Sequence, residues 1–218
     1  MSAYQKFNQE PAVHIRRPRL HPVRTLDAGD VLFHETDPAT CLFEVKSGVL
    51  RLTRLLENGR RHVIGFAHAG DIVGFSSDHG HTADCTALSE TTVLVHRRGE
   101  GDSRDANAEQ GCDIEAAAMR QIETLQDHLL LMARPGACGK LASFLLAQVD
   151  HQAGTRADLS VLQLEMPRSD IADYLCMTPE TVSRALTKMR RGGLIRLETA
   201  QRIAILDREG LAEMAGAE

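Results

Sequence analysis

Residues 170–191 read DIADYLCMTPETVSRALTKMRR, and this stretch guides the interpretation of the whole chain. The pattern predicts two short helices separated by a tight turn at Cys176-Met177. Thr178 can cap the second helix with its hydroxyl, and Pro179 occupies the first helical position, where a missing N–H has no cost. The two glycines that follow end this helix. Such a pair of helices is typical of a helix-turn-helix.

The second helix divides into an apolar face and a polar face. We expect the apolar face to pack inward through Val182, Ala185, Leu186 and Met189. On the polar face, Arg184 can bind guanine O6 and N7, Glu180 can accept from cytosine N4, and Ser183 can reach a base edge. We therefore expect these three residues to read bases. A second polar set is expected to contact the DNA backbone: Arg168, Ser169, Thr178, Thr181, Lys188 and Arg190.

The segments around this motif complete a winged helix-turn-helix over residues 134–218. Residues 137–152 predict a helix, and 159–166 a short strand. Alternating residues at 194–197 and 202–206 predict a hairpin, the wing.

Residues 21–103 have a different texture, with short apolar stretches separated by turn signals about every ten residues. This spacing predicts a β-roll. Asn58-Gly59 predicts a hairpin with a type I′ turn, which needs positive φ at both central residues. We expect residues 1–20, with their basic cluster, to form a flexible tail.

A long helix is predicted within residues 104–133, where apolar residues recur at spacings of three and four. The seam consists of Ile114, Ala118, Ile122, Leu125, Leu129 and Met132. The pattern leaves two alternatives open. The helix either lies on its own β domain or pairs with a second copy in a parallel coiled coil.

The composition excludes several classes of protein. Apolar residues make up 43% and charged residues 25% of the 218, which is globular, and the net charge of −5 restricts any nucleic-acid surface to a local patch. The longest apolar run, near residues 129–133, is too short to span a membrane, and the chain starts without a signal peptide, so we expect a cytoplasmic protein. Five scattered cysteines suggest neither a disulfide framework nor a zinc site. Without a nucleophile motif or a phosphate-binding loop, we expect no enzyme.

The motif at 170–186, with its Glu-Thr-Val-Ser-Arg core, resembles the helix-turn-helix of the CRP–FNR family of bacterial transcription regulators. The segments 43–48 and 69–74 match the family's sensor turns, and the resemblance covers about residues 24–206. It implies an α+β fold with an N-terminal β-roll like a cyclic-nucleotide-binding jelly roll, a long dimerisation helix and a C-terminal winged helix-turn-helix. It also implies a homodimer that binds double-stranded DNA and RNA polymerase, and it favours the dimer seam.

Glu180, Ser183 and Arg184 resemble the FNR and FixK branch of this family, which reads TTGAT half-sites in an inverted repeat. The resemblance implies an activator of genes for low-oxygen or nitrogen-oxide metabolism. FNR-type sensors hold an iron–sulfur cluster with N-terminal cysteines, but no cysteine precedes Cys41 here. The chain is therefore similar to FixK-like members.

The sensor segment departs from the cyclic-AMP-binding pattern. The family's glutamate is absent from the turn Gly74-Phe75-Ser76, and His81 stands in the place of the phosphate-binding arginine. We therefore expect neither cyclic nucleotide nor another cofactor.

Two alternatives concern histidines and cysteines. The His79–Cys85 region has donors for a metal or haem, which would make the protein a gas or redox sensor. Oxidation of Cys176 in the turn of the DNA-binding motif would inactivate the regulator. We interpret His62 and His68 as surface residues.

Overall fold

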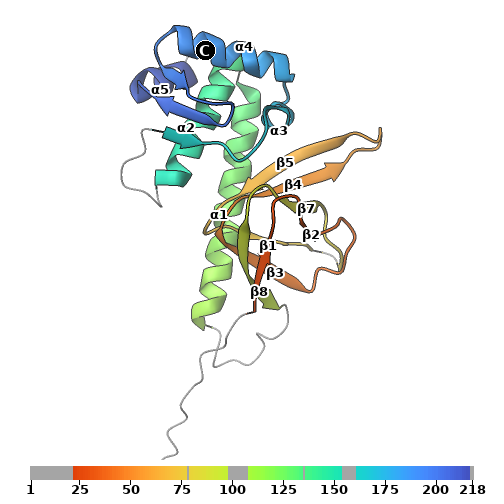
Figure 1. Cartoon of the computed structure of the whole chain (residues 1–218). Helices are drawn as coiled ribbons and strands as arrows, with labels where there is room; N and C mark the ends of the chain where they lie inside the picture. The colour runs from red at the N-terminus through yellow and green to blue at the C-terminus, as the bar shows by residue number, and fades with distance from the viewer. Residues whose placement is uncertain (1–21, 78, 98–107, 135, 154–160, 217–218) are drawn as a thin grey trace, which may run out of the picture.

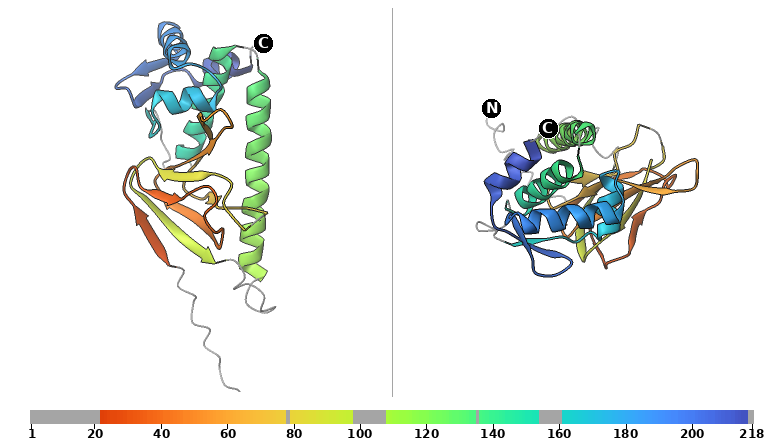
Figure 2. Two further views of the ribbon diagram at one scale, coloured as in Figure 1. Left: turned by 90° about the vertical axis from the view of Figure 1, so that its right-hand side faces the viewer. Right: turned by 90° about the horizontal axis from the view of Figure 1, so that it is seen from above.

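The structure is a computed structural model that describes residues 22–77, 79–97, 108–134, 136–153 and 161–216, with side chains of the first long helix described from Ile114. The expected tail at 1–20 and the linker before the long helix lie outside these ranges. A β domain and a helical domain lie at opposite ends of the molecule, and one long helix runs along both (Figures 1 and 2). No helix in the described ranges is long and apolar enough to cross a membrane.

The β domain is a roll of two four-stranded antiparallel sheets, as the sequence predicts. Its strands are, in chain order, β1 Val23–Leu26, β2 Val31–Phe33, β3 Cys41–Ser47, β4 Leu50–Leu55, β5 Arg61–Ala67, β6 Ile72–Val73, β7 Asp84–Ala87 and β8 Thr91–Arg97. One sheet has the order β1-β8-β3-β6 and the other β2-β7-β4-β5. Alternating residues bury one face of each sheet, so Val45, Leu50 and Val93 are fully enclosed between them.

The hairpin between β4 and β5 is present, but its turn differs from the predicted type I′. Gly59 has a φ of +76°, whereas Asn58 is not among the described residues with positive φ. The Gly59 N–H donates to Leu56 O at 2.8 Å. Five residues separate the two strands, so the turn closes at Gly59 and only this residue needs the left-handed conformation.

The long helix α1 spans Ala108–Ala133 in the described part of the chain, within the predicted range 104–133. Ala117 is buried against Leu42 and Ile72, so one side of α1 packs on the β-roll. The helix ends where predicted, and Gly136, with a φ of +88°, lies in the connection to α2.

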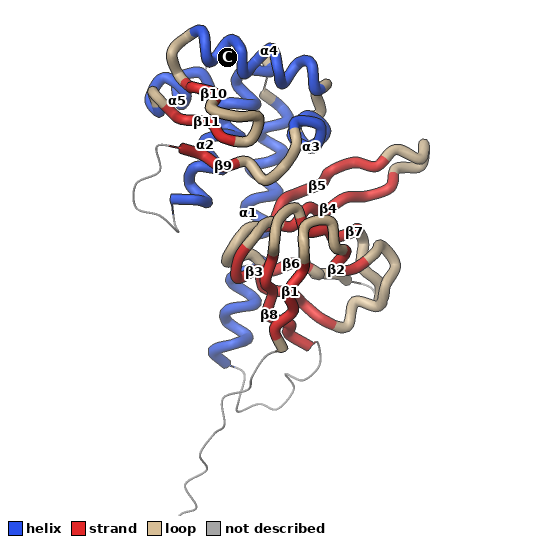
Figure 3. Tube along the Cα trace, viewed as in Figure 1, coloured by secondary structure: helices blue, strands red, loops and turns tan. Residues whose placement is uncertain are grey.

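The helical domain comprises α2 Ala137–Ala153, β9 Val161–Gln163, α3 Arg168–Tyr174, α4 Pro179–Arg191, β10 Ile195–Leu197, β11 Arg202–Ile205 and α5 Arg208–Gly216. The three strands form one sheet in the order β10-β11-β9 beside α2 (Figure 3). Helix α5 was not predicted from the sequence. Asp207 accepts from the Gly210 N–H at 2.8 Å, and Leu211 and Ala215 are buried. This capping residue and the apolar spacing of four were the available signals.

The interpretation of His62 and His68 as surface residues is wrong, since both lie between the two domains. His68 is 8% exposed and stacks on His151 of α2 with ring centroids 4.6 Å apart. Burial, followed by the charge of His151, lowers the pKa of His68 to about 4. His62 is half-buried, with Nδ1 2.9 Å from Asp173 Oδ1 of α3.

Candidate nucleic-acid interface

Helix α4 has the two faces that the sequence predicts. Val182, Ala185, Leu186 and Met189 are at most 3% exposed and pack in the core of the helical domain. Glu180 and Arg184 are exposed on the opposite side, and Ser183 beside them is half-buried. Helix α4 lies at the end of the molecule farthest from β1 and β8 (Figure 1). Its polar face is therefore open to a large partner.

The start of α4 is fixed by local interactions. Thr178 is the N-cap, and its Oγ1 accepts from the Thr181 N–H at 3.2 Å, with Pro179 at the first helical position. Glu180 is fully exposed. A hydrogen bond to its own backbone, one with Thr178 and the charge of Arg184 hold its pKa below the ordinary value. The helix thus presents a charged carboxylate and a guanidinium one turn apart.

The predicted backbone-contacting residues surround this pair. Lys188 and Arg190 are exposed along α4, and Ser169 is exposed near the start of α3. Arg168 is half-buried, with Nη1 3.4 Å from Ser183 Oγ, so α3 and α4 meet at this point. Their contacts with DNA stay predictions.

Two positive groups outside the predicted set also lie near the interface. Arg191 is exposed and continues the row that starts with Glu180 and Arg184, at helical spacing. Arg196 of the wing is exposed and pairs with Glu198 at 3.5 Å.

Cys176 lies in the turn between α3 and α4. Its side chain is exposed, and its φ is +53°, a conformation that is uncommon for residues other than glycine. The Met177 N–H donates to Ala172 O at 2.7 Å, which closes the turn. The thiol is thus accessible beside α4, and its control by oxidation stays a prediction.

The exposed side of α1 carries a row of apolar residues. Ile122, Leu125 and Leu129 of the predicted seam are 48%, 51% and 69% exposed. Ala118 is half-buried, as are the two ends of the seam, Ile114 and Met132, which pack within their own subunit. Two exposed residues outside the prediction widen the row: Met119 and Leu130. One side of α1 therefore covers the β-roll, and the other is free of the subunit's core. The pairing of two copies through this exposed side stays a prediction.

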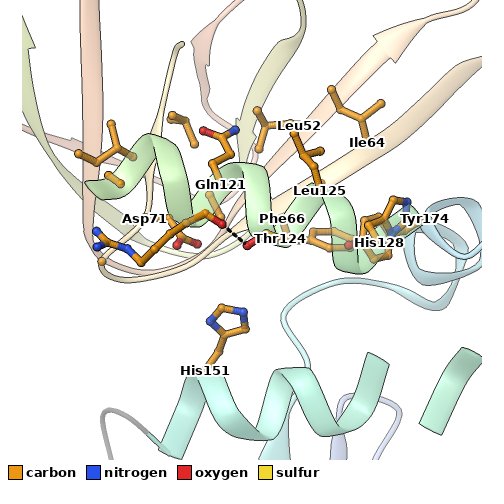
Figure 4. Close-up of a pocket in the computed structure, with 17 residues that line it drawn as sticks. Leu52, Ile64, Phe66, Asp71, Gln121, Thr124, Leu125, His128, His151 and Tyr174 are labelled. Carbon is orange, nitrogen blue, oxygen red and sulfur yellow. Dashed lines mark hydrogen bonds between the residues drawn. The ribbon is translucent and has the colours of Figure 1, made fainter. Parts of the chain in front are cut away.

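A cavity of about 130 Å³ lies between α1 and the β-roll. Figure 4 shows Leu52 and Phe66 from the strands facing Gln121, Leu125 and His128 of α1. The cavity has the volume of about four water molecules. Gln121 Oε1 and His128 Nδ1 are buried here without a hydrogen-bond partner among the described residues.

His81, which stands where the resemblance would place a phosphate-binding arginine, packs against side chains of the β-roll. His81 is 5% exposed and stacks on Phe33 with ring centroids 3.8 Å apart. Gly74 has a φ of +96°, and a Cβ there would lie 3.1 Å from Cys41 O and 3.3 Å from the His81 ring. The backbone and the imidazole thus approach each other closely.

The alternative of a metal or haem at His79–Cys85 finds no support in the part of the chain that the structure describes. No group of three or more histidine, cysteine or acidic residues there could hold a metal ion. Cys85 is fully buried, and this burial raises the pKa of its thiol to about 12, so it is a poor thiolate ligand. Asp84 accepts from the Glu35 N–H at 2.8 Å.

Comparison with known proteins agrees with this geometry. Residues 139–214 match the Crp-like helix-turn-helix domain, and 23–100 match the cyclic nucleotide-binding domain. The nitrogen fixation regulation protein FixK of Rhizobium meliloti is 34% identical over 90% of this chain and 88% of the relative. The chain belongs to the CRP–FNR family of transcription regulators. FixK of Bradyrhizobium diazoefficiens is 35% identical over 77% of this chain and 71% of the relative.

Solved structures of related regulators have the same fold as this chain. The structure of FixK2 from Bradyrhizobium japonicum has a TM-score of 0.80, 28% identity, and covers 91% of this chain and 99% of that one. A CRP-family regulator from Thermus thermophilus, at 22% identity and 89% of this chain and 97% of that one, has a TM-score of 0.74. The predicted β-roll, long helix and helix-turn-helix are confirmed, as is the prediction of a FixK-like member. The relatives named here are regulators of transcription rather than enzymes.

Proposed function

We propose that the protein is a homodimeric activator of transcription that binds a TTGAT-N4-ATCAA-like inverted repeat. The observation that carries this proposal is the exposed face of α4, on which Glu180, Ser183 and Arg184 lie together on a capped helix. Because activation requires recruitment of the transcription machinery, RNA polymerase is the expected partner. The protein would act in the cytoplasm, where bacterial DNA lies.

The half-site constrains how this face reads DNA. TTGAT contains one G·C pair, and Arg184 prefers guanine whereas Glu180 accepts from cytosine. The two side chains are one helical turn apart, so we assign both to that single base pair. Ser183, half-buried against Arg168, would reach the neighbouring base.

The exposed apolar row on α1 supports the dimer. A row containing Ile122, Leu125 and Leu129 on a monomer surface is costly unless a partner covers it. A second copy of α1 provides a self-complementary partner and the two-fold symmetry that an inverted repeat requires. We propose the division into a β-roll at 21–103, a dimerisation helix at 104–133 and a winged helix-turn-helix at 134–218.

The β-roll supports regulation without a cyclic nucleotide. His81 replaces the arginine that would hold the phosphate, and its buried ring stacks on Phe33. The cavity beside α1, at about 130 Å³, is close to the size that accepts a single benzene-sized molecule and too small for a nucleotide.

The names of two relatives suggest the regulated genes. They are a nitrogen fixation regulation protein and a fumarate and nitrate reduction regulatory protein. We propose that the present protein likewise controls low-oxygen or nitrogen-oxide metabolism.

A comparison of two variants tests this proposal. Arg184→Ala should weaken binding to the operator by about 1–3 kcal/mol and relax discrimination at the G·C pair, where Glu180 remains. Lys188→Ala, on the same helix, should weaken operator and scrambled DNA alike, because a phosphate contact carries no sequence information. Equal loss on both DNAs for Arg184→Ala would contradict the assignment.

A further inference from the structure

Helix α3 has a third face besides those directed to the core and to α4. Asp170, Asp173 and Tyr174 occur at spacings of three and one, which places them on one side of the helix. This side, which we call the docking face, is turned toward the rest of the subunit. Each of its residues contacts a different element outside the helical domain.

Asp170 binds the β-roll. Its Oδ2 accepts from Arg51 Nη1 of β4 at 2.6 Å, and the two side chains are only 13% and 18% exposed. Such a shielded pair is weakened by salt far less than a surface pair.

Asp173 binds the next strand with both carboxylate oxygens. Oδ1 lies 2.9 Å from His62 Nδ1, and Oδ2 accepts from the Val63 N–H at 2.6 Å. The β4–β5 hairpin thus contacts α3 at two acidic residues that lie three positions apart.

Tyr174 completes the docking face against α1. Its ring stacks on His128 with centroids 4.1 Å apart, and Phe66 of β5 packs 5.3 Å away. Burial raises the pKa of the Tyr174 phenol to about 12, so the ring stays neutral at physiological pH. The helix-turn-helix is therefore held to both the β-roll and the dimerisation helix.

The docking face leaves the DNA-reading surface uncovered. Glu180 and Arg184 stay exposed while all three docking contacts are made. A contact that masks α4 would instead bury these side chains. The docking face therefore fixes the orientation of the helix-turn-helix within its subunit and does not block the binding of DNA.

In a dimer built on α1, the separation of the two copies of α4 depends on how each helix-turn-helix sits against its own α1. An inverted repeat demands that separation, because its half-sites lie about one helical turn apart. We propose that the docking face sets the distance between the two recognition helices, with Arg51, His62 and His128 as positioning residues. This proposal rests on the proposed dimer and operator.

The first test compares full operators with a single half-site. Arg51→Ala should bind the four-base-pair-spaced repeat at least five-fold more weakly than the unmodified protein but bind an isolated half-site equally well. Its preference for a four-base-pair spacer over three or five should also shrink. Arg54→Ala is the matched control, because Arg54 lies on the same hairpin, is 55% exposed and, among the described residues, pairs with Glu35 alone, at 4.0 Å. This control should leave unchanged the affinities for the isolated half-site and for the repeats with spacers of three, four and five base pairs.

Two results of this test would overturn the proposal. Equal loss on the full repeat and on the half-site would mean that Arg51 merely stabilises the helix-turn-helix. Unchanged or tighter binding to the full repeat would mean that the docking face does not favour the DNA-binding arrangement. If the unmodified protein fails to prefer the repeat over scrambled DNA, the proposed operator is wrong, and the second test decides the positioning role alone.

The second test needs no DNA. A spin label on exposed Cys176, with Cys41, Cys112 and Cys138 replaced by serine and buried Cys85 retained, reports the distance between the two helix-turn-helix motifs of a dimer. We expect a narrow distribution of label-to-label distances when Arg51 is present and a broad or displaced distribution after Arg51→Ala. An identical distribution, or no measurable distance at all, would overturn the proposal.

Discussion

Arg168 Nη1 lies 3.4 Å from the hydroxyl of Ser183, so the first helix of the motif contacts a residue that we expect to read DNA. Arg168 Nε is also buried without a hydrogen-bond partner among the described residues. Because that nitrogen is enclosed, a phosphate oxygen beside this half-buried side chain would accept from the other N–H groups of the guanidinium. Arg168 therefore has two expected roles, orienting Ser183 and neutralising a phosphate.

Removal of Arg168 should separate these roles. We expect Arg168→Ala to reduce the slope of log affinity against log salt by about 0.9, as for one lost phosphate contact. Ser183→Ala should leave the slope unchanged and relax selectivity at one base pair. Titrations of operator DNA at several salt concentrations measure both. An unchanged slope in Arg168→Ala would exclude the phosphate contact.

Loss of the cap on α4 should destabilise the helical domain. Thr178→Ala removes the acceptor of the Thr181 N–H and should lower the free energy of unfolding by about 1 kcal/mol. The matched control is Thr187→Ala, since Thr187 lies inside the same helix and its hydroxyl donates to Ser183 O rather than to a free N–H at the helix start. Urea unfolding measures the difference. Equal effects of the two variants would show that the cap contributes nothing specific.

The left-handed conformation of Cys176 predicts opposite effects for two substitutions. Glycine adopts a φ of +53° without strain, whereas a β-branched residue does not. Cys176→Gly should therefore keep or raise stability, and Cys176→Val should lower it by about 1–3 kcal/mol. Thermal unfolding of the reduced proteins provides the measurement, and a valine variant as stable as the glycine variant would refute this explanation.

Buried His68 predicts a loss of stability in mild acid. Its pKa falls from 6.5 in the unfolded chain to about 4 in the folded protein, so the unfolded state binds the extra proton. Neutral His68 therefore makes its full contribution to the free energy of unfolding above pH 6.5. This contribution is lost as the pH falls toward 4, by at most about 1.4 kcal/mol per pH unit.

The variant His68→Phe tests this contribution. It keeps a ring against His151 and removes the titration, so its stability should fall less steeply between pH 6.5 and 4. Exposed His34→Phe serves as the control and should follow the unmodified protein. Parallel pH profiles for His68→Phe and the unmodified protein would contradict the assignment.

The helix-turn-helix was predictable because its signals are local. Thr178, Pro179 and the apolar spacing from Val182 to Met189 act within a few residues of one another, and the structure follows them closely. The β4–β5 hairpin was also predictable, but its turn type was not. The loop length, rather than the Asn-Gly pair, determines which residue needs positive φ.

The contacts between the domains could not be predicted from local pattern. His62 and Asp173 are 111 residues apart in the sequence, and Arg51 and Asp170 are 119 apart. Nothing in the neighbourhood of His62 or His68 indicates burial, because the burying surface comes from α2 and α3. The candidate DNA-reading face was predictable, whereas the elements that orient it were not.

The most direct test of the account is the binding of the reduced, purified protein to a TTGAT-N4-ATCAA duplex without added ligand. Scrambled DNA of the same length, at one fixed physiological salt concentration, provides the reference. We predict that the protein binds the inverted repeat as a dimer and at least a thousand-fold more tightly than the scrambled duplex. Equal affinity for the two duplexes would contradict the account.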